Sequence, residues 1–97
     1  MRFCLPTLLL FFSLTPGAAA WAGPPAGQVL YQKNCAPCHG ANGRKGLSSA
    51  HDLTKSNLNA YGRAYLVTNG FGKMPSFKKT LSEVQIQQIV AYSLTLR

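Results

Sequence analysis

The chain has 97 residues, with ten Lys or Arg against two Asp or Glu and a formal net charge of +8 at pH 7. This length excludes more than one small domain. The positive excess suits an acidic protein surface or nucleic acid, but the chain contains no nucleic-acid-binding motif, so we expect no nucleic-acid partner.

The first 22 residues have the layout of a secretory signal peptide. Met1-Arg2 gives a short positive start, residues 3–14 are nearly all apolar, and Ala20-Trp21-Ala22 fits the cleavage rule. We expect cleavage after Ala22, with Ala20 as the second choice. The exported product is then a single domain over residues 23–97.

An uncleaved membrane anchor is the alternative, because residues 3–22 carry no charge over the length of one membrane span. The strongly apolar core covers only about a dozen residues, which is short for a spanning helix. Cys4 precedes this core, so we expect it to be lost with the leader. About 75 residues remain, a size at which a hydrophobic core alone is marginal.

A helical pattern begins at Ala26 and continues to Asn34. Gly27 and Tyr31 are four residues apart and therefore share one face. A glycine in that position lets a second helix cross closely, because it has no side chain.

Residues 35–39 form a Cys-x-x-Cys-His motif, the attachment signature of a c-type haem. Cys35 and Cys38 fall on one face of a helical turn, so both can reach one edge of a porphyrin, with His39 beneath the iron. A zinc site needs about four ligands, and outside the motif the chain offers only Cys4 and His51. A thioredoxin-like pair expects a βαβ setting, which the sequence does not predict. We expect one haem c bound covalently through Cys35 and Cys38, with His39 as an axial ligand.

Three glycines within residues 40–46 predict a loop around one edge of this haem. His51 follows and is the only rival to Met74 for the sixth iron position. Its spacing of 12 from His39 (51−39) is tight for reaching the opposite face of the ring. We therefore rank Met74 above His51.

A short helix is predicted to start at Ser56 or Asn57, either of which can cap it. It should run to about Thr68 and end at Asn69-Gly70. Its apolar side is expected to be formed by Tyr61, Tyr65 and Leu66.

Met74 lies before Pro75 in a loop-like stretch over residues 69–77, with Phe71 and Phe77 on either side. A lone methionine is usually a packing residue. Loss of the leader leaves this as the only methionine, however, and its loop setting favours a ligand. We predict that Met74 is the second axial ligand of the haem iron.

The last helix is the clearest in the sequence. Ser82 and Gln85 form a capping box, and apolar residues then recur at helical spacing: Ile86, Ile89, Val90, Tyr92 and Leu94. No strand pattern competes with it. We expect an all-α domain of three to four short helices around one haem, in which this helix crosses the Gly27 to Tyr31 helix.

Together these motifs resemble a class I cytochrome c, most closely the small cytochrome c6 or c-553 type. The resemblance rests on Gly27-x-x-x-Tyr31, Cys35-x-x-Cys38-His39, the Asn69-Gly70 to Met74-Pro75-x-Phe77 segment and the closing helix. It implies that Cys35 and Cys38 carry the haem, with His39 as proximal ligand and Met74 as distal ligand. It also implies a monomeric single-electron carrier without enzymatic activity, working between the cytochrome bf complex and photosystem I or an equivalent oxidase, in the thylakoid lumen or periplasm.

One feature departs from that family. Many relatives have a proline soon after the Cys-x-x-Cys-His motif, and its carbonyl orients the proximal histidine. Here no proline lies between Pro37 and Pro75, so a different acceptor must hold the outer ring nitrogen of His39.

Lys73, Lys78 and Lys79 flank the Met74 loop and predict a positive rim that docks on the acidic surface of a redox partner. Two alternatives to a soluble carrier stay open. One is a membrane-anchored respiratory cytochrome c module. The other is a haem enzyme or gas-binding protein in which the Met74 bond is labile.

Overall fold

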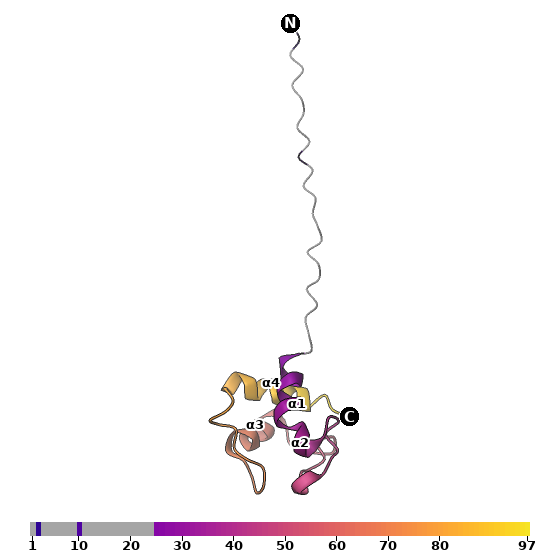
Figure 1. The fold of residues 1–97 in the computed structure, drawn as a ribbon, viewed down its shortest axis with the longest axis vertical. Helices are drawn as coiled ribbons and strands as arrows, with labels where there is room; N and C mark the ends of the chain where they lie inside the picture. Colours follow the sequence, from indigo (N-terminus) through magenta and orange to yellow (C-terminus); the bar gives the residue numbers. More distant parts are fainter. Residues whose placement is uncertain (1, 3–9, 11–24) are drawn as a thin grey trace.

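The computed structural model describes residues 2, 10 and 25–97, so the predicted leader and its cleavage site lie outside the described residues apart from Arg2 and Leu10. The helices in order are α1 (Ala26–Asn34), α2 (Ala36–His39), a 3-10 turn η1 (Leu47–Ser49), α3 (Ala60–Asn69) and α4 (Glu83–Ser93) (Figure 1). No strand occurs in this part of the chain beyond an isolated bridge between Phe71 and Met74. The predicted all-α fold is confirmed. None of the helices described is both long enough and apolar enough to cross a membrane.

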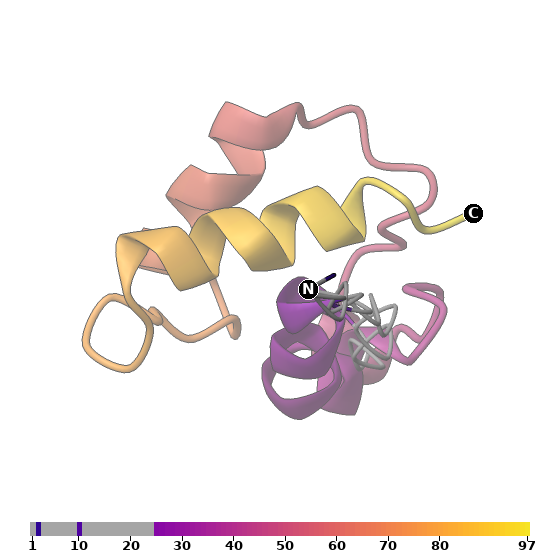
Figure 2. The ribbon, with the colours of Figure 1, turned by 90° about the horizontal axis from the view of Figure 1, so that it is seen from above.

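Helix α4 is the central element of the domain. It packs against both α1 and α3, whereas α1 and α3 do not contact each other, and Figure 2 shows α4 lying between them. Two buried clusters result, one on each side of α4. The first contains Tyr31, Cys35 and Ile89, and the second contains Val67, Ile86 and Val90.

The α1–α4 crossing depends on Gly27. A Cβ atom at this position would collide with the carbonyl oxygen of Gln88, and would lie 2.8 Å from the carbonyl carbon and 3.3 Å from Cβ of Tyr92. Tyr31, one turn further along α1, is fully buried, and its ring packs against Tyr92 with centroids 5.2 Å apart. The predicted close crossing of these two helices is confirmed.

The capping box of α4 is also confirmed. The hydroxyl of Ser82 accepts from the backbone N–H of Gln85 at 3.1 Å, and Oε1 of Gln85 accepts from the N–H of Ser82 at 2.9 Å. The buried stripe of α4 consists of Ile86, Ile89, Val90 and Ser93. Leu94 was expected in this stripe, but it is 44% exposed because the helix ends at Ser93 and Leu94 caps it.

The prediction for α3 was wrong in its start and in two of the three residues expected on its apolar side, whereas the third, Leu66, is partly buried as expected. Asn59, rather than Ser56 or Asn57, caps the helix, since its side chain accepts from the N–H of Gly62 at 3.0 Å. Tyr61 and Tyr65 are 88% and 67% exposed. The residues of α3 that are buried are Arg63 and Val67.

The cause is the rotation of α3 about its own axis. Ala64 and Val67 pack against the second cluster beside α4, and this contact turns Tyr61 and Tyr65, which lie on another face, outward. The predicted end of the helix at Asn69-Gly70 is confirmed, with Gly70 as C-cap.

The crossing predicts that Gly27→Ala destabilises the protein. The added methyl group must displace the Gln88 carbonyl, so we expect the free energy of unfolding to fall by about 1–3 kcal/mol, the usual cost of overpacking. Denaturant unfolding of the haem-loaded protein measures this. The matched control is Gly46→Ala, because a Cβ there meets only an ordinary contact at 3.6 Å. Equal unfolding midpoints for the two variants would contradict a rigid crossing at Gly27.

Candidate haem site

A cavity of about 400 Å³ lies between the α1–α2 wall and the wall formed by α3, within the size range typical of small-molecule sites. Its lining is mostly apolar and comes from every helix and from the connecting loops. The residues on which the argument depends are Tyr31, Cys35, Cys38, His39, His51, Arg63 and Met74. All four predicted site residues (Cys35, Cys38, His39 and Met74) therefore line one cavity.

The two cysteines have free thiols. Cys35 is the N-cap of the short helix α2, and Cys38 lies within that helix. Cys35 is 8% exposed, whereas Cys38 is open to solvent. Burial raises the pKa of the Cys35 thiol to about 11, and Cys38 adds a smaller electrostatic contribution. Metal-binding and redox-active cysteines have a lowered pKa. The apolar setting of Cys35, which favours the neutral thiol, therefore fits a thioether bond better than a metal ligand or a redox-active thiol.

A zinc site also fails on the number of ligands. No three His, Cys, Asp or Glu side chains gather to hold a metal ion anywhere in the described residues, and a structural zinc needs about four ligands. The residues present fit a haem instead: two thiols beside an imidazole on one wall, and a thioether on another segment of the same cavity.

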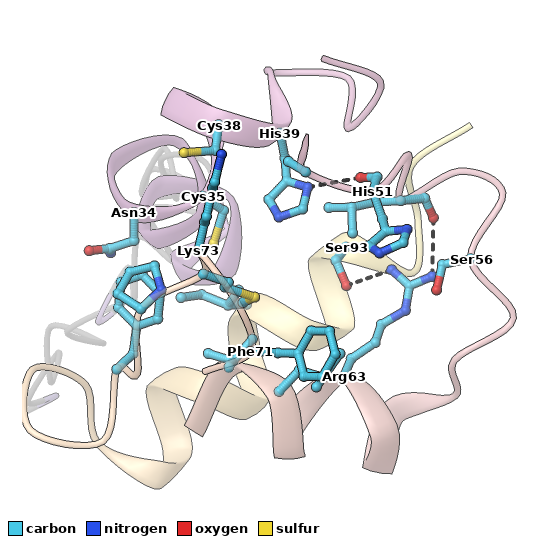
Figure 3. A pocket seen from close by; sticks show the side chains of 18 of the residues that line it. Asn34, Cys35, Cys38, His39, His51, Ser56, Arg63, Phe71, Lys73 and Ser93 are labelled. Carbon is cyan, nitrogen blue, oxygen red and sulfur yellow. Dashed lines mark hydrogen bonds between the residues drawn. The ribbon is translucent and has the colours of Figure 1, made fainter. Parts of the chain in front are cut away.

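The ring of His39 is held by a backbone carbonyl. Its Nδ1 lies 3.0 Å from the carbonyl oxygen of His51 (Figure 3). A carbonyl can only accept, so Nδ1 carries the proton and the unprotonated Nε2 is left available as a ligand. This hydrogen bond supplies the acceptor that the missing proline left unassigned.

The loop that carries His51 is fastened at several points. The N–H of Lys45 donates to the carbonyl of His39 at 2.8 Å, and the N–H of Leu53 donates to the carbonyl of Gly43 at 2.8 Å. Tyr31 adds a third tie, because its hydroxyl donates to the carbonyl of Gly40 at 2.7 Å. The predicted loop over residues 40–46 is thus ordered by the same helix that leads into the motif.

Met74 sits in a tight turn. The N–H of Phe71 donates to the carbonyl of Met74 at 3.1 Å, and the N–H of Met74 donates back at 2.9 Å. Gly70, with φ at +75°, permits this turn, since a Cβ there would lie 2.7 Å from the Met74 carbonyl oxygen. Met74 is partly buried against the second cluster.

The Met74 turn is also tied back to α3. The N–H of Phe77 donates to the carbonyl of Val67 at 2.9 Å, and the hydroxyl of Ser76 donates to the carbonyl of Thr68. Both acceptor carbonyls belong to the last turns of α3. The position of Met74 is therefore set by the same helix that forms one wall of the cavity.

Arg63 is a site residue that the sequence analysis missed. It reaches from α3 to the cavity wall and donates to the hydroxyl of Ser93 on α4 at 3.0 Å (Figure 3). A signal was present in the sequence: Arg63 lies one helical turn before Val67, and these two are the buried residues of α3. A charged residue within such a stripe indicates a buried polar contact.

Comparison with known proteins identifies the family to which the chain is similar. The family model described as cytochrome c oxidase, cbb3-type, subunit III matches residues 22–92. Cytochrome c6 of Leptolyngbya boryana is 39% identical over 79 residues, covering 75% of this chain and 92% of that protein. Cytochrome c6 of Rippkaea orientalis is 37% identical over 95 residues, covering 90% and 84%.

Solved structures give the same result. Cytochrome c6 of the diatom Phaeodactylum tricornutum superposes with a TM-score of 0.62 at 30% identity, over 71% of this chain and 87% of that one. Cytochrome c6C of Synechococcus sp. PCC 7002 has a TM-score of 0.62 at 28% identity, over 71% and 90%. The chain therefore belongs to the cytochrome c family, in the small class I cytochrome c6 type, and haem c is the cofactor that this membership implies.

Proposed function

We propose that this protein is a single-electron carrier in which haem c occupies the cavity, attached to Cys35 and Cys38, with His39 and Met74 as axial ligands. The observation that carries the proposal is the convergence of both thiols, the imidazole and the thioether on one mostly apolar cavity. Bound there, haem c supplies a one-electron ferric–ferrous couple. It is a carrier rather than an enzyme because both axial positions are filled by the protein.

The residues around the site support a rigid, reversible couple. The His51 carbonyl holds the ring of His39, which fixes the imidazole plane and makes it a better electron donor. Met74 offers a soft thioether that favours reduced iron. Because hydrogen bonds to α3 and across the turn fasten its loop, Met74 can stay bound in both oxidation states.

The leader forms a separate part of the proposal. We assign residues 1–22 to a signal peptide that is removed on export, and residues 23–97 to the monohaem domain. Export explains how two thiols meet haem outside a reducing cytosol. The location is then the thylakoid lumen or the periplasm. We assign the partners as the cytochrome bf complex and photosystem I, or an equivalent oxidase, with the carrier acting as a monomer.

The rim beside the Met74 turn supports docking on acidic surfaces. Lys73, Lys78 and Lys79 are all exposed, and Lys73 also lines the cavity. Phe71, 71% exposed next to them, adds an apolar contact at the same place. An apolar centre within a positive rim suits brief, electrostatically steered encounters with an acidic partner.

Met74→Ala should retain covalent haem but lose the methionine-to-iron charge-transfer band, and the reduced protein should bind carbon monoxide. The reduction potential should fall by at least about 59 mV, a tenfold change for a one-electron couple. Optical spectra measure the charge-transfer band and carbon monoxide binding, and redox titration measures the potential. The control is His51→Ala, which keeps the backbone carbonyl that holds His39.

The opposite result would assign the sixth iron position to His51: His51→Ala would bind carbon monoxide, and Met74→Ala would keep the spectrum and potential of the unmodified protein. Rapid carbon monoxide binding by the unmodified reduced protein would instead favour the gas-binding alternative.

Replacing the rim lysines should slow the reaction with an acidic partner. We expect Lys78→Gln combined with Lys79→Gln to lower the second-order rate constant at low salt about tenfold, at the lower end of what steering contributes. The difference should vanish as salt screens the charges. Stopped-flow kinetics over a salt series provides the measurement. Lys33→Gln combined with Lys55→Gln removes the same charge from other exposed positions, and an equal effect there would reject a localised rim.

The mass of the purified, exported protein tests the leader. We expect the mass of residues 23–97 plus one haem, because the leader is cleaved and the haem is covalent. Retention of residues 1–22 together with membrane association would support the anchored module in place of the soluble carrier.

A further inference from the structure

Tyr31 carries a hydroxyl group that the helix crossing does not explain. The side chain is 0% exposed, and its ring fills the space between α1 and α4, against Ile89 and Tyr92. A phenylalanine ring would fill the same space. A hydroxyl group taken out of water costs free energy unless it is hydrogen-bonded. The presence of a tyrosine at this position therefore directs attention to the partner of its hydroxyl, the carbonyl of Gly40, at 2.7 Å.

The bond from Tyr31 to Gly40 spans the whole Cys-x-x-Cys-His motif. Tyr31 lies one helical turn before Cys35, and Gly40 follows His39 directly. Gly40 is the C-cap of α2, with φ at +81°, and is the point at which the chain leaves the motif for the loop. Burial, with smaller contributions from Cys35 and Tyr92, raises the pKa of the Tyr31 hydroxyl to about 12. The hydroxyl therefore stays protonated at neutral pH and remains a donor.

The carbonyl of Gly40 also begins a series of hydrogen bonds that leads to the axial histidine. It accepts a second bond from the N–H of Gly43 at 3.1 Å, and the carbonyl of Gly43 accepts from the N–H of Leu53 at 2.8 Å. Leu53 lies two residues after His51, whose carbonyl oxygen is 3.0 Å from Nδ1 of His39. The loop that orients His39 is thus connected, bond by bond, to helix α1.

Other contacts of this loop leave its position against α1 less well defined. The bond between Gly40 and Gly43 lies within the loop, so it shapes the loop without fixing it to a helix. The side chain of Leu53 packs against the cluster that contains Tyr31, but apolar contacts are non-directional. A hydrogen bond to a carbonyl has a preferred distance and angle. The bond from Tyr31 therefore defines where the loop starts relative to α1.

We propose that the Tyr31 hydroxyl is a positioning group for the axial histidine. Its bond to Gly40 fixes the loop over residues 40–53 against α1, and so holds the His51 carbonyl where it accepts a strong hydrogen bond from His39. This inference rests on the proposed function, because it treats His39 as an iron ligand.

The expected effect on the iron has a definite sign. A hydrogen bond from Nδ1 to a carbonyl makes the imidazole a better electron donor, and a better donor favours ferric iron. Loss of the Tyr31 hydroxyl should let the His51 carbonyl move away from Nδ1 of His39, which weakens the donor. The reduction potential should therefore rise, in the opposite direction to the fall expected for Met74→Ala.

The experiment compares haem-loaded Tyr31→Phe with the unmodified protein. Covalent haem and a low-spin spectrum are checked first in the unmodified protein, because their absence there would reject the proposed function rather than this inference. NMR of the oxidised protein then measures how fast the Nδ1 proton of His39 exchanges with solvent, and redox titration measures the potential. We expect exchange to become about fivefold faster, the effect of one lost ordinary hydrogen bond. The ferric–ferrous equilibrium should shift toward ferrous iron by at most the same factor.

Tyr92→Phe is the matched control. It removes a hydroxyl from the ring that packs against Tyr31 but leaves the bond to Gly40 in place, so the exchange rate and the potential should both stay unchanged. Equal changes in the two variants would reject a specific role for the Tyr31 hydroxyl. A Tyr31→Phe protein that unfolds more easily, yet keeps the exchange rate and potential of the unmodified protein, would overturn the inference and leave Tyr31 as a packing residue.

A fluorinated tyrosine tests the same bond in the opposite direction, and it decides the question if Tyr31→Phe does not fold. With fluorine beside the hydroxyl, the side chain at position 31 becomes a stronger donor in a ring of nearly the same size. Exchange of the His39 proton should then be slower, and the potential lower, than in the unmodified protein. Unchanged values, or changes of the opposite sign, would contradict the proposed role of Tyr31.

Discussion

The close crossing of α1 and α4 is the contact on which the rest of the domain depends. With no side chain at Gly27, α1 can lie against the backbone of α4 at Gln88. Tyr31 and Cys35, further along the same chain segment, then pack against Ile89. This contact fixes where α1 passes into α2, and so fixes the direction in which Cys38 and His39 leave the backbone. The crossing therefore determines one wall of the cavity before any cofactor is considered.

The opposite wall is placed through the same helix. Val67 of α3 packs against Ile86 and Val90 of α4, on the other side of α4 from Ile89 and Tyr31. Since α1 and α3 do not touch, the space between them is left to the cavity. Few apolar side chains are fully buried in such a small domain, and a small core of this kind is marginal alone. A large apolar ring bound between the two clusters would join them into one core.

The sequence predicted features that depend on local chemistry. The Cys35 to His39 motif, the Ser82–Gln85 cap and the Gly27–Tyr31 spacing each carry their own signal, and each has its expected structural setting. The buried face of α3 has no such signal, because apolar residues occur on more than one of its sides and only contact with α4 selects Val67 over Tyr65. The acceptor for His39 is a backbone carbonyl, which every residue has, so no residue type could identify His51.

The positive charges of the domain act on different quantities because of where they lie. Lys78 and Lys79 are exposed, so salt screens them and they act on how fast a partner is met. Arg63 is buried and fixed by three hydrogen bonds, so salt screens it much less and its field acts on the interior of the cavity that it lines. A change at the rim can therefore alter the encounter rate without altering the potential. A change at Arg63 would instead alter the electrostatic environment inside the cavity that it lines.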